Sequence, residues 1–178
     1  AGARRDLEAL GYYVEAFRLV PGNFVALFRA GRIRDPAAPA DKDAARREQL
    51  MRRALIANGT FAPALAELAE LLADRPDRAD EAIGLARKAC ALDPAASTHR
   101  LALWNVLRRC GRTEDAGRVE EELLRVARRD RTALFELTER LEQQDRVKDA
   151  EALLMKARAA SPRSPMVAMM VADFLQRH

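Results

Sequence analysis

Histidine and cysteine, which supply most metal ligands and many catalytic nucleophiles, are almost absent from this chain. Only His99, His178, Cys90 and Cys110 occur among 178 residues. Neither histidine has a second histidine or a cysteine at metal-ligand spacing, so the sequence predicts no metal site. Two cysteines are too few for a disulfide framework, and we interpret both as small apolar residues inside helices.

Glycine-rich phosphate loops are missing as well. Neither Gly-x-Gly-x-x-Gly nor the phosphate-loop pattern occurs, so the sequence predicts no nucleotide cofactor. The run Glu120-Glu121-Glu122 and the pair Glu139 and Glu142 fall on predicted helices, where solvated surface charge is their usual role. His99 is interpreted as an exposed residue at a helix start. No nucleophile, acid and base come together, and we predict a chain that is not an enzyme and carries no cofactor.

Long apolar runs and aromatic residues are also scarce. No stretch of about 18 apolar residues exists, so no membrane span is predicted. Apolar residues make up 49% of the chain and aromatic residues only 5%, whereas alanine occurs 36 times. Alanine is the best intrinsic helix former and lets helices approach closely. This composition predicts closely packed helices without a sheet.

Charge of one sign dominates only in the first third. Residues 1–60 carry 11 basic and 7 acidic side chains, and residues 61–178 carry 20 of each. An excess this small is more typical of a solvated surface than of a nucleic-acid interface. Nucleic-acid binding through the arginine-rich first third is therefore the least favoured of our functional hypotheses.

What the chain does have is a period of 34 residues. Ala82, Ala116 and Ala150 are spaced at this interval in matching contexts, and the pair Leu103-x3-Leu107 recurs as Leu137-x3-Leu141. Such a period is the signature of a repeat architecture. Within each unit, apolar residues at spacings of three and four predict two amphipathic helices. The expected ranges are 22–34, 61–74, 96–110, 131–144 and 164–177 for the first helices, and 4–20, 41–57, 78–92, 113–129 and 147–160 for the second.

The pattern resembles the tetratricopeptide repeat family. The residues that carry the resemblance are Leu65, Leu68-Ala69, Leu72, Ala82, Ala89 and Pro94, then Leu134, Leu137, Leu141, Ala150, Ala157 and Pro162, and upstream Ala9, Tyr13, Ala16 and Pro21. Trp104 departs from the pattern at a site that is usually small, and Asp145 stands where glycine is usual. The resemblance implies an all-α, right-handed superhelical solenoid of antiparallel helix pairs. Its implied function is a scaffold for protein–protein interaction.

The organisation expected from this pattern is a single array over residues 1–178. It would hold about four to five helix pairs, begin in the middle of a repeat, and carry a loop insertion at about residues 34–41. We expect it to be part of a longer protein.

In this architecture the first helices line a concave groove. Side chains one residue around the helix from the packing stripe should face that groove. The predicted groove residues are Phe28, Arg32, Leu101, Asn105, Arg108, Phe135, Glu139, Met169 and Asp173. We expect a protein or peptide ligand that is acidic near Arg32 and basic near Asp173. The Lys and Asn set with which some family members clamp a carboxylate terminus is not present.

Two alternatives stay open at the level of sequence. Phe135 and Met169 could pack between repeats instead of lining a groove. The array could also serve as an accessory or dimerisation module of a larger enzyme, with a homodimer formed through the apolar terminal helices at about 4–20 and 164–177.

Overall fold

The computed structural model describes residues 2–129, 131–143 and 145–178, and every regular element in these ranges is helical. The helices are α1 (Gly2–Leu19), α2 (Phe24–Arg32), α3 (Ala40–Ala57), α4 (Ala62–Leu72), η1 (Pro76–Arg78), α5 (Ala79–Leu92), α6 (Ser97–Arg109), α7 (Thr113–Arg129), α8 (Arg131–Gln143), α9 (Val147–Ala160) and α10 (Pro165–Arg177). Each α-helix begins and ends within two residues of the range expected from the repeat. None of the described helices is both long and apolar enough to cross a membrane.

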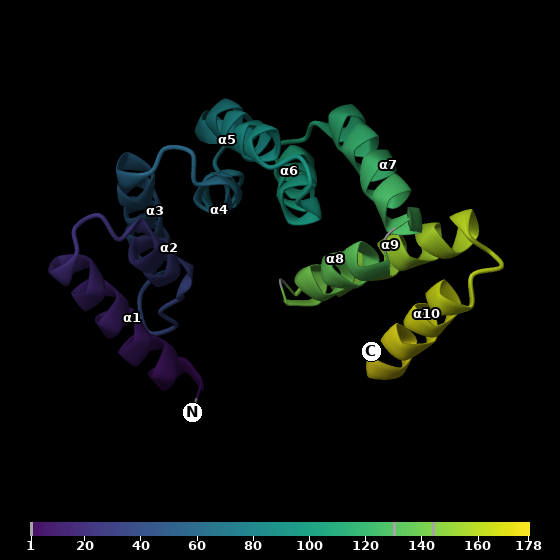
Figure 1. Ribbon diagram of the computed structural model, residues 1–178, viewed down its shortest axis with the longest axis horizontal. Coiled ribbons are helices and arrows are strands. Elements are labelled where there is room, and N and C mark those ends of the chain that lie inside the picture. The colour runs from purple at the N-terminus through teal and green to yellow at the C-terminus, as the bar shows by residue number, and fades with distance from the viewer. Residues whose placement is uncertain (1, 130, 144) are drawn as a thin grey trace.

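The helices form an arc (Figure 1). Each helix packs against the next one along the chain, and α4 also packs on α6, α6 on α8 and α7 on α9. Short connections between neighbours make successive helices antiparallel. In Figure 1, α4, α6 and α8 lie on the inner side of the arc and α3, α5 and α7 on the outer side, while α1 and α10 form its two ends. The fold is a helical solenoid of helix pairs, as the sequence predicted.

The core follows the predicted packing stripe. Leu68, Leu72 and Ala82 are each at most 1% exposed, and so are the corresponding Leu137 and Ala150 two repeats later. Alanine at these positions lets two helix backbones approach closely, and leucine on the facing helix fills the space between them. One connected cluster of such residues extends from α2 to α10, so each pair depends on its neighbours for burial.

Side chains from the first two turns of α3 hold the segment between α2 and α3 in place through hydrogen bonds and an ion pair. The side chain of Asp43 is mostly buried and accepts a hydrogen bond from the backbone amide of Asp35 at 3.2 Å. Arg46 pairs with Asp43 at 2.6 Å and donates to the carbonyl of Ile33 at 2.6 Å. Arg47 donates from Nε to the carbonyl of Gly31 at 2.9 Å. These bonds fix how the chain leaves the concave side after α2.

Two interpretations made from the sequence can be compared with the structure. His99 was expected to be exposed, and this was wrong. It is only 7% exposed, because it lies in the first turn of α6, which begins at Ser97 and is already buried against the rest of the array. Both cysteines are free and half-buried; Cys90 lies inside α5 as expected, whereas Cys110 follows the last residue of α6 and is not inside a helix. Ser164 caps α10 by accepting a hydrogen bond from the backbone amide of Val167 at 3.3 Å.

Two turns at the ends of inner helices place their central residue in the left-handed region. Gly111 has φ +72° after α6, and Asp145 has φ +58° after α8. In both turns the next residue donates its amide back to the helix: Arg112 to Leu107 and Arg146 to Leu141. Asp145 thus occupies the position of Gly111, one repeat later, in the same conformation.

Gly111→Ala should therefore destabilise the fold by about 1–2 kcal/mol, because an L side chain is strained at positive φ. Gly84→Ala is the matched control: Gly84 lies on the exposed face of α5 with nothing near its missing Cβ, so the same change should stabilise by up to about 1 kcal/mol. Urea denaturation of both variants measures the difference. Effects of the same sign would contradict this account of the turn.

Candidate functional site

A hollow shared by several helices lies on the concave side. It has a volume of about 800 Å³ and is lined by residues of α2, α3, α4, α6 and α8 and of the segments that follow α2, α4 and α8. Its lining is mainly charged or polar: Arg32, Arg34, Arg47, Glu67, Glu70, Asp74, Asn105, Arg109, Gln143, Asp145 and Arg146, with Ala40, Ala44 and Leu71. We call this hollow the concave groove.

Ion pairs between repeats fix much of the charge along the groove. Arg32 of α2 lies 3.3 Å from Glu67 of α4. Arg109 of α6 donates through Nε and Nη2 to both carboxylate oxygens of Asp74, just after α4, with 2.7 Å from Nε to Oδ1. These hydrogen bonds lower the pKa of Asp74 below its ordinary value. The inner helices are therefore joined by pairs of opposite charge rather than by apolar contact alone.

A chain of polar side chains, centred on the buried Asn105, connects three repeats at the groove. Asn105 is 1% exposed, donates from Nδ2 to Glu70 at 3.2 Å, and accepts a hydrogen bond from Nη1 of Arg146. Arg146 also pairs with Asp149 at 2.6 Å, and Arg108 donates to the second oxygen of the same carboxylate. The chain thus links α4, α6 and α9, which belong to three successive repeats.

The ring of Trp104 packs against the two arginines of this network. Its ring lies 4.9 Å from the guanidinium carbon of Arg108 and 5.2 Å from that of Arg146. Stacking on an aromatic face suits the planar guanidinium, which is weakly hydrated. The large residue that departs from the repeat pattern therefore acts as a platform for the two arginines that hold Asp149.

The two ends of the groove carry charges without such partners. Among the described residues, no carboxylate lies within ion-pair distance of Arg34 or Arg47. Burial and the nearby Arg34 guanidinium lower the pKa of Arg47, and Asp43 and Glu67 offset only part of this effect. At the opposite end, Asp145 is exposed and has no cation within the same distance in the described part of the chain. The groove charges that lack an ion-pair partner among these residues are therefore positive at α2–α3 and negative at the turn between α8 and α9.

A second, smaller pocket lies between α8 and α10. It has a volume of about 40 Å³ and is lined by Phe135, Thr138, Glu139, Met170, Asp173 and Arg177. Phe135 is 47% exposed. Arg177 is engaged elsewhere, because its guanidinium bonds both oxygens of Glu142 at 3.0 and 3.3 Å. We call this site the α8–α10 pocket.

The structure divides the predicted groove residues into three groups and leaves Met169 apart from them. Phe28, Leu101 and Asn105 are at most 8% exposed, so they have little surface to offer a ligand. Phe28 packs edge-on against Phe61 at 5.1 Å, because α2 is turned so that this residue faces α4. Arg32 and Arg108 remain at the surface, where they are held by Glu67 and Asp149. Phe135, Glu139 and Asp173 come together in the α8–α10 pocket, and Met169, 65% exposed, does not line it.

Sequence reasoning missed Arg34, Arg47 and Arg146. Arg47 lies on a second helix and Arg34 in the loop after α2, and neither position was expected to reach the concave side. Arg146 follows the turn residue Asp145, at a position for which the family pattern has no preferred residue. The 34-residue spacing within this chain could still have indicated it, since Arg112 follows Gly111 in the same way.

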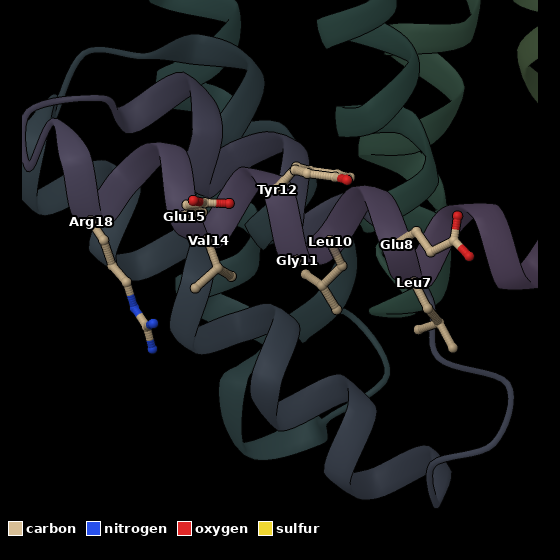
Figure 2. Close-up of a pocket in the computed structure, with 8 residues that line it drawn as sticks. All are labelled: Leu7, Glu8, Leu10, Gly11, Tyr12, Val14, Glu15 and Arg18. Carbon is tan, nitrogen blue, oxygen red and sulfur yellow. The ribbon is translucent and has the colours of Figure 1, made fainter.

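A hollow on α1 has no comparable chemistry. Figure 2 shows its eight lining residues, and all of them belong to this one helix. Three are charged, Glu8, Glu15 and Arg18, and the others are Leu7, Leu10, Gly11, Tyr12 and Val14. This is the open face of a helix rather than a cleft between elements. No group of three potential metal ligands occurs among the described residues.

Comparisons with known proteins agree with the repeat architecture. No family model and no curated protein matches the chain. Among solved structures, TTC0263, a thermophilic TPR protein of Thermus thermophilus, superposes with a TM-score of 0.62 at 16% identity, covering 97% of this chain and 91% of that one. YrrB, a TPR protein described as having an unusual peptide-binding site, gives 0.53 at 16% identity, covering 95% and 84%. The chain therefore has the fold of tetratricopeptide-repeat proteins.

The ion pairs of the groove predict a defined response to acid. Burial would raise the pKa of Asp149, but hydrogen bonds from Arg108 and Arg146 lower it below the ordinary 3.8. Because the folded-state pKa is depressed, ionised Asp149 stabilises the fold above the unfolded pKa, and this stabilisation is lost as the pH falls through the folded value. Wild type should therefore exceed Asp149→Asn in unfolding free energy at about pH 7, and the gap should close toward about pH 2. Urea titrations over this range measure it, and a gap that does not change with pH would contradict the assignment.

Proposed function

We propose that this chain is a protein-interaction scaffold that binds an extended peptide segment along its concave groove. The observation that carries the proposal is the charge order of the concave side, with Arg34 and Arg47 at one end of the groove and Asp145 at the other. Two further carboxylates, those of Glu139 and Asp173, lie in the α8–α10 pocket farther along the array. An extended peptide rises about 3.3 Å per residue and can follow such a groove, placing charged side chains at both ends.

The groove favours a peptide over a nucleic acid. A phosphate backbone carries one sign of charge along its whole length. In this groove it would meet Arg34 and Arg47 first and then the carboxylates of Glu67, Glu70 and Asp74. A peptide with an acidic end and a basic end avoids that conflict. YrrB, a protein of the same fold with an unusual peptide-binding site, supports only the general role of peptide binding.

The charge order can be tested with peptides selected on the wild-type chain from a random display library. The double variant Arg34→Glu, Arg47→Glu should weaken their binding by about tenfold or more, because it reverses the unpaired positive end. Arg125→Glu, Arg163→Glu is the matched control, since it changes the net charge equally at exposed positions outside the groove. Fluorescence anisotropy measures the affinity of the selected peptides for the wild type and for both double variants. Equal losses in the two double variants would show that net charge, rather than the groove, attracts the peptide.

Phe135 should act as an apolar anchor for the same peptides. Truncating a central aromatic anchor typically costs about 2 kcal/mol of binding, whereas an exposed rim charge costs far less. Phe135→Ala should therefore weaken binding much more than Glu122→Ala, an exposed change on α7. Since Phe135 is 47% exposed, its removal should leave the array folded, as circular dichroism would report. If Phe135→Ala melts the protein while the remaining folded molecules bind normally, the residue belongs to the core.

A further inference from the structure

The α8–α10 pocket combines three features that together suit one kind of side chain. It has a partly exposed aromatic ring in Phe135, a flexible thioether in Met170, and two carboxylates at its edge, Glu139 and Asp173. Among the described residues, no cation lies within ion-pair distance of either carboxylate. The one cation in the lining, Arg177, is bound by Glu142, which also contacts His178 at 2.9 Å.

This arrangement leaves negative charge beside an apolar, aromatic wall. A cation is attracted both by the carboxylates and by the face of an aromatic ring. The long apolar stem of a basic side chain can lie along apolar groups while its charged end stays near the carboxylates. Phe135 and Met170 provide such a wall, and Glu139 and Asp173 provide the charged end.

Size decides between the two basic side chains. A cavity needs a volume of roughly 10–15 Å³ to hold one group the size of a water molecule. The pocket, at about 40 Å³, therefore has room for about three such groups. An ammonium with its last methylenes fits this space, whereas a planar guanidinium is broader and is better served by a bidentate carboxylate.

We infer that the α8–α10 pocket holds a lysine side chain of the bound peptide, with its ammonium between Glu139 and Asp173 and its stem against Phe135 and Met170. This inference rests on the proposed function, because the lysine would belong to the basic end of the peptide in the concave groove. It names lysine as the basic residue of the peptide and the α8–α10 pocket as the place where it binds. It also gives Phe135 a defined role as the wall of that pocket.

The probe for this inference is Nα-acetyl-lysine amide, a single blocked lysine, titrated into the full chain and followed by NMR. Its neutral relative Nα-acetyl-norleucine amide keeps most of the stem without the charge, and Nα-acetyl-arginine amide tests the size argument. The signals to follow are the methyl groups of Thr138 and Met170 and the ring of Phe135. We expect saturable shifts at these signals with the lysine probe, and weaker ones with the other two.

The variant Glu139→Gln, Asp173→Asn should weaken lysine binding by about three- to tenfold, and added salt should do the same, because the ion pairs are solvent-exposed. Glu136→Gln, Glu151→Gln is the matched control, since both residues are exposed and lie outside the pocket. Equal binding of norleucine and lysine would overturn the inference, and so would the absence of saturable shifts at the pocket or an equal effect of the two double variants.

The small probe keeps this test separate from that of the proposed function. If lysine binds in the pocket but no library peptide binds along the groove, the proposed function fails and the pocket stands as a site for free basic groups. If library peptides bind while the lysine probe gives none of the expected shifts, the scaffold function stands and the lysine site is wrong.

Discussion

Burial between successive helix pairs is the interaction on which the rest of this molecule depends. A single pair cannot cover the apolar stripe on its own helices, so each stripe is covered by the next pair along the chain. Residues such as Ala69, Ala82 and Ala150 keep the backbones close, and leucines on the facing helices fill the gaps. Curvature into an arc, a concave side and an outer side all follow from repeating this one contact (Figure 1).

Ion pairs between repeats add a second level of organisation. On the concave side, hydrogen bonds connect Glu70 of α4 to Asn105 and Asn105 to Arg146, and an ion pair connects Arg146 to Asp149. Away from the groove, Arg52 bridges to Glu81 at 2.8 Å and Lys156 to Glu120 at 2.7 Å, again between successive repeats. Exposed pairs of this kind contribute at most about 1 kcal/mol each, so they orient the repeats more than they hold them together. Because of these pairs, the groove charges that keep no ion-pair partner among the described residues are those at its two ends, Arg34 and Arg47 at one and Asp145 at the other.

The period of 34 residues was enough to predict the helices, their order and the packing stripe, because burial imposes the same residues at the same place in each repeat. It even indicated that Asp145 takes the place of a turn glycine, and the structure shows the same left-handed conformation there. The groove was harder to predict. Equivalent phase put Phe28, Leu101 and Phe135 in one row, but the helices are rotated differently against their neighbours, so that the first two are buried and the third is exposed. Arg34 and Arg47 come from a loop and an outer helix, where the repeat carries no information about the concave side.

The central claim is that a peptide lies along the concave groove between its oppositely charged ends. Mapping backbone amide shifts on the full chain, with a peptide selected from the random library, tests this most directly. The account predicts perturbed amides along one line across the repeats, at Arg34, Leu71, Asn105 and Asp145, with the outer faces of α3, α5 and α7 unaffected. Perturbations confined to those outer faces, or to α1 at the end of the arc, would contradict it.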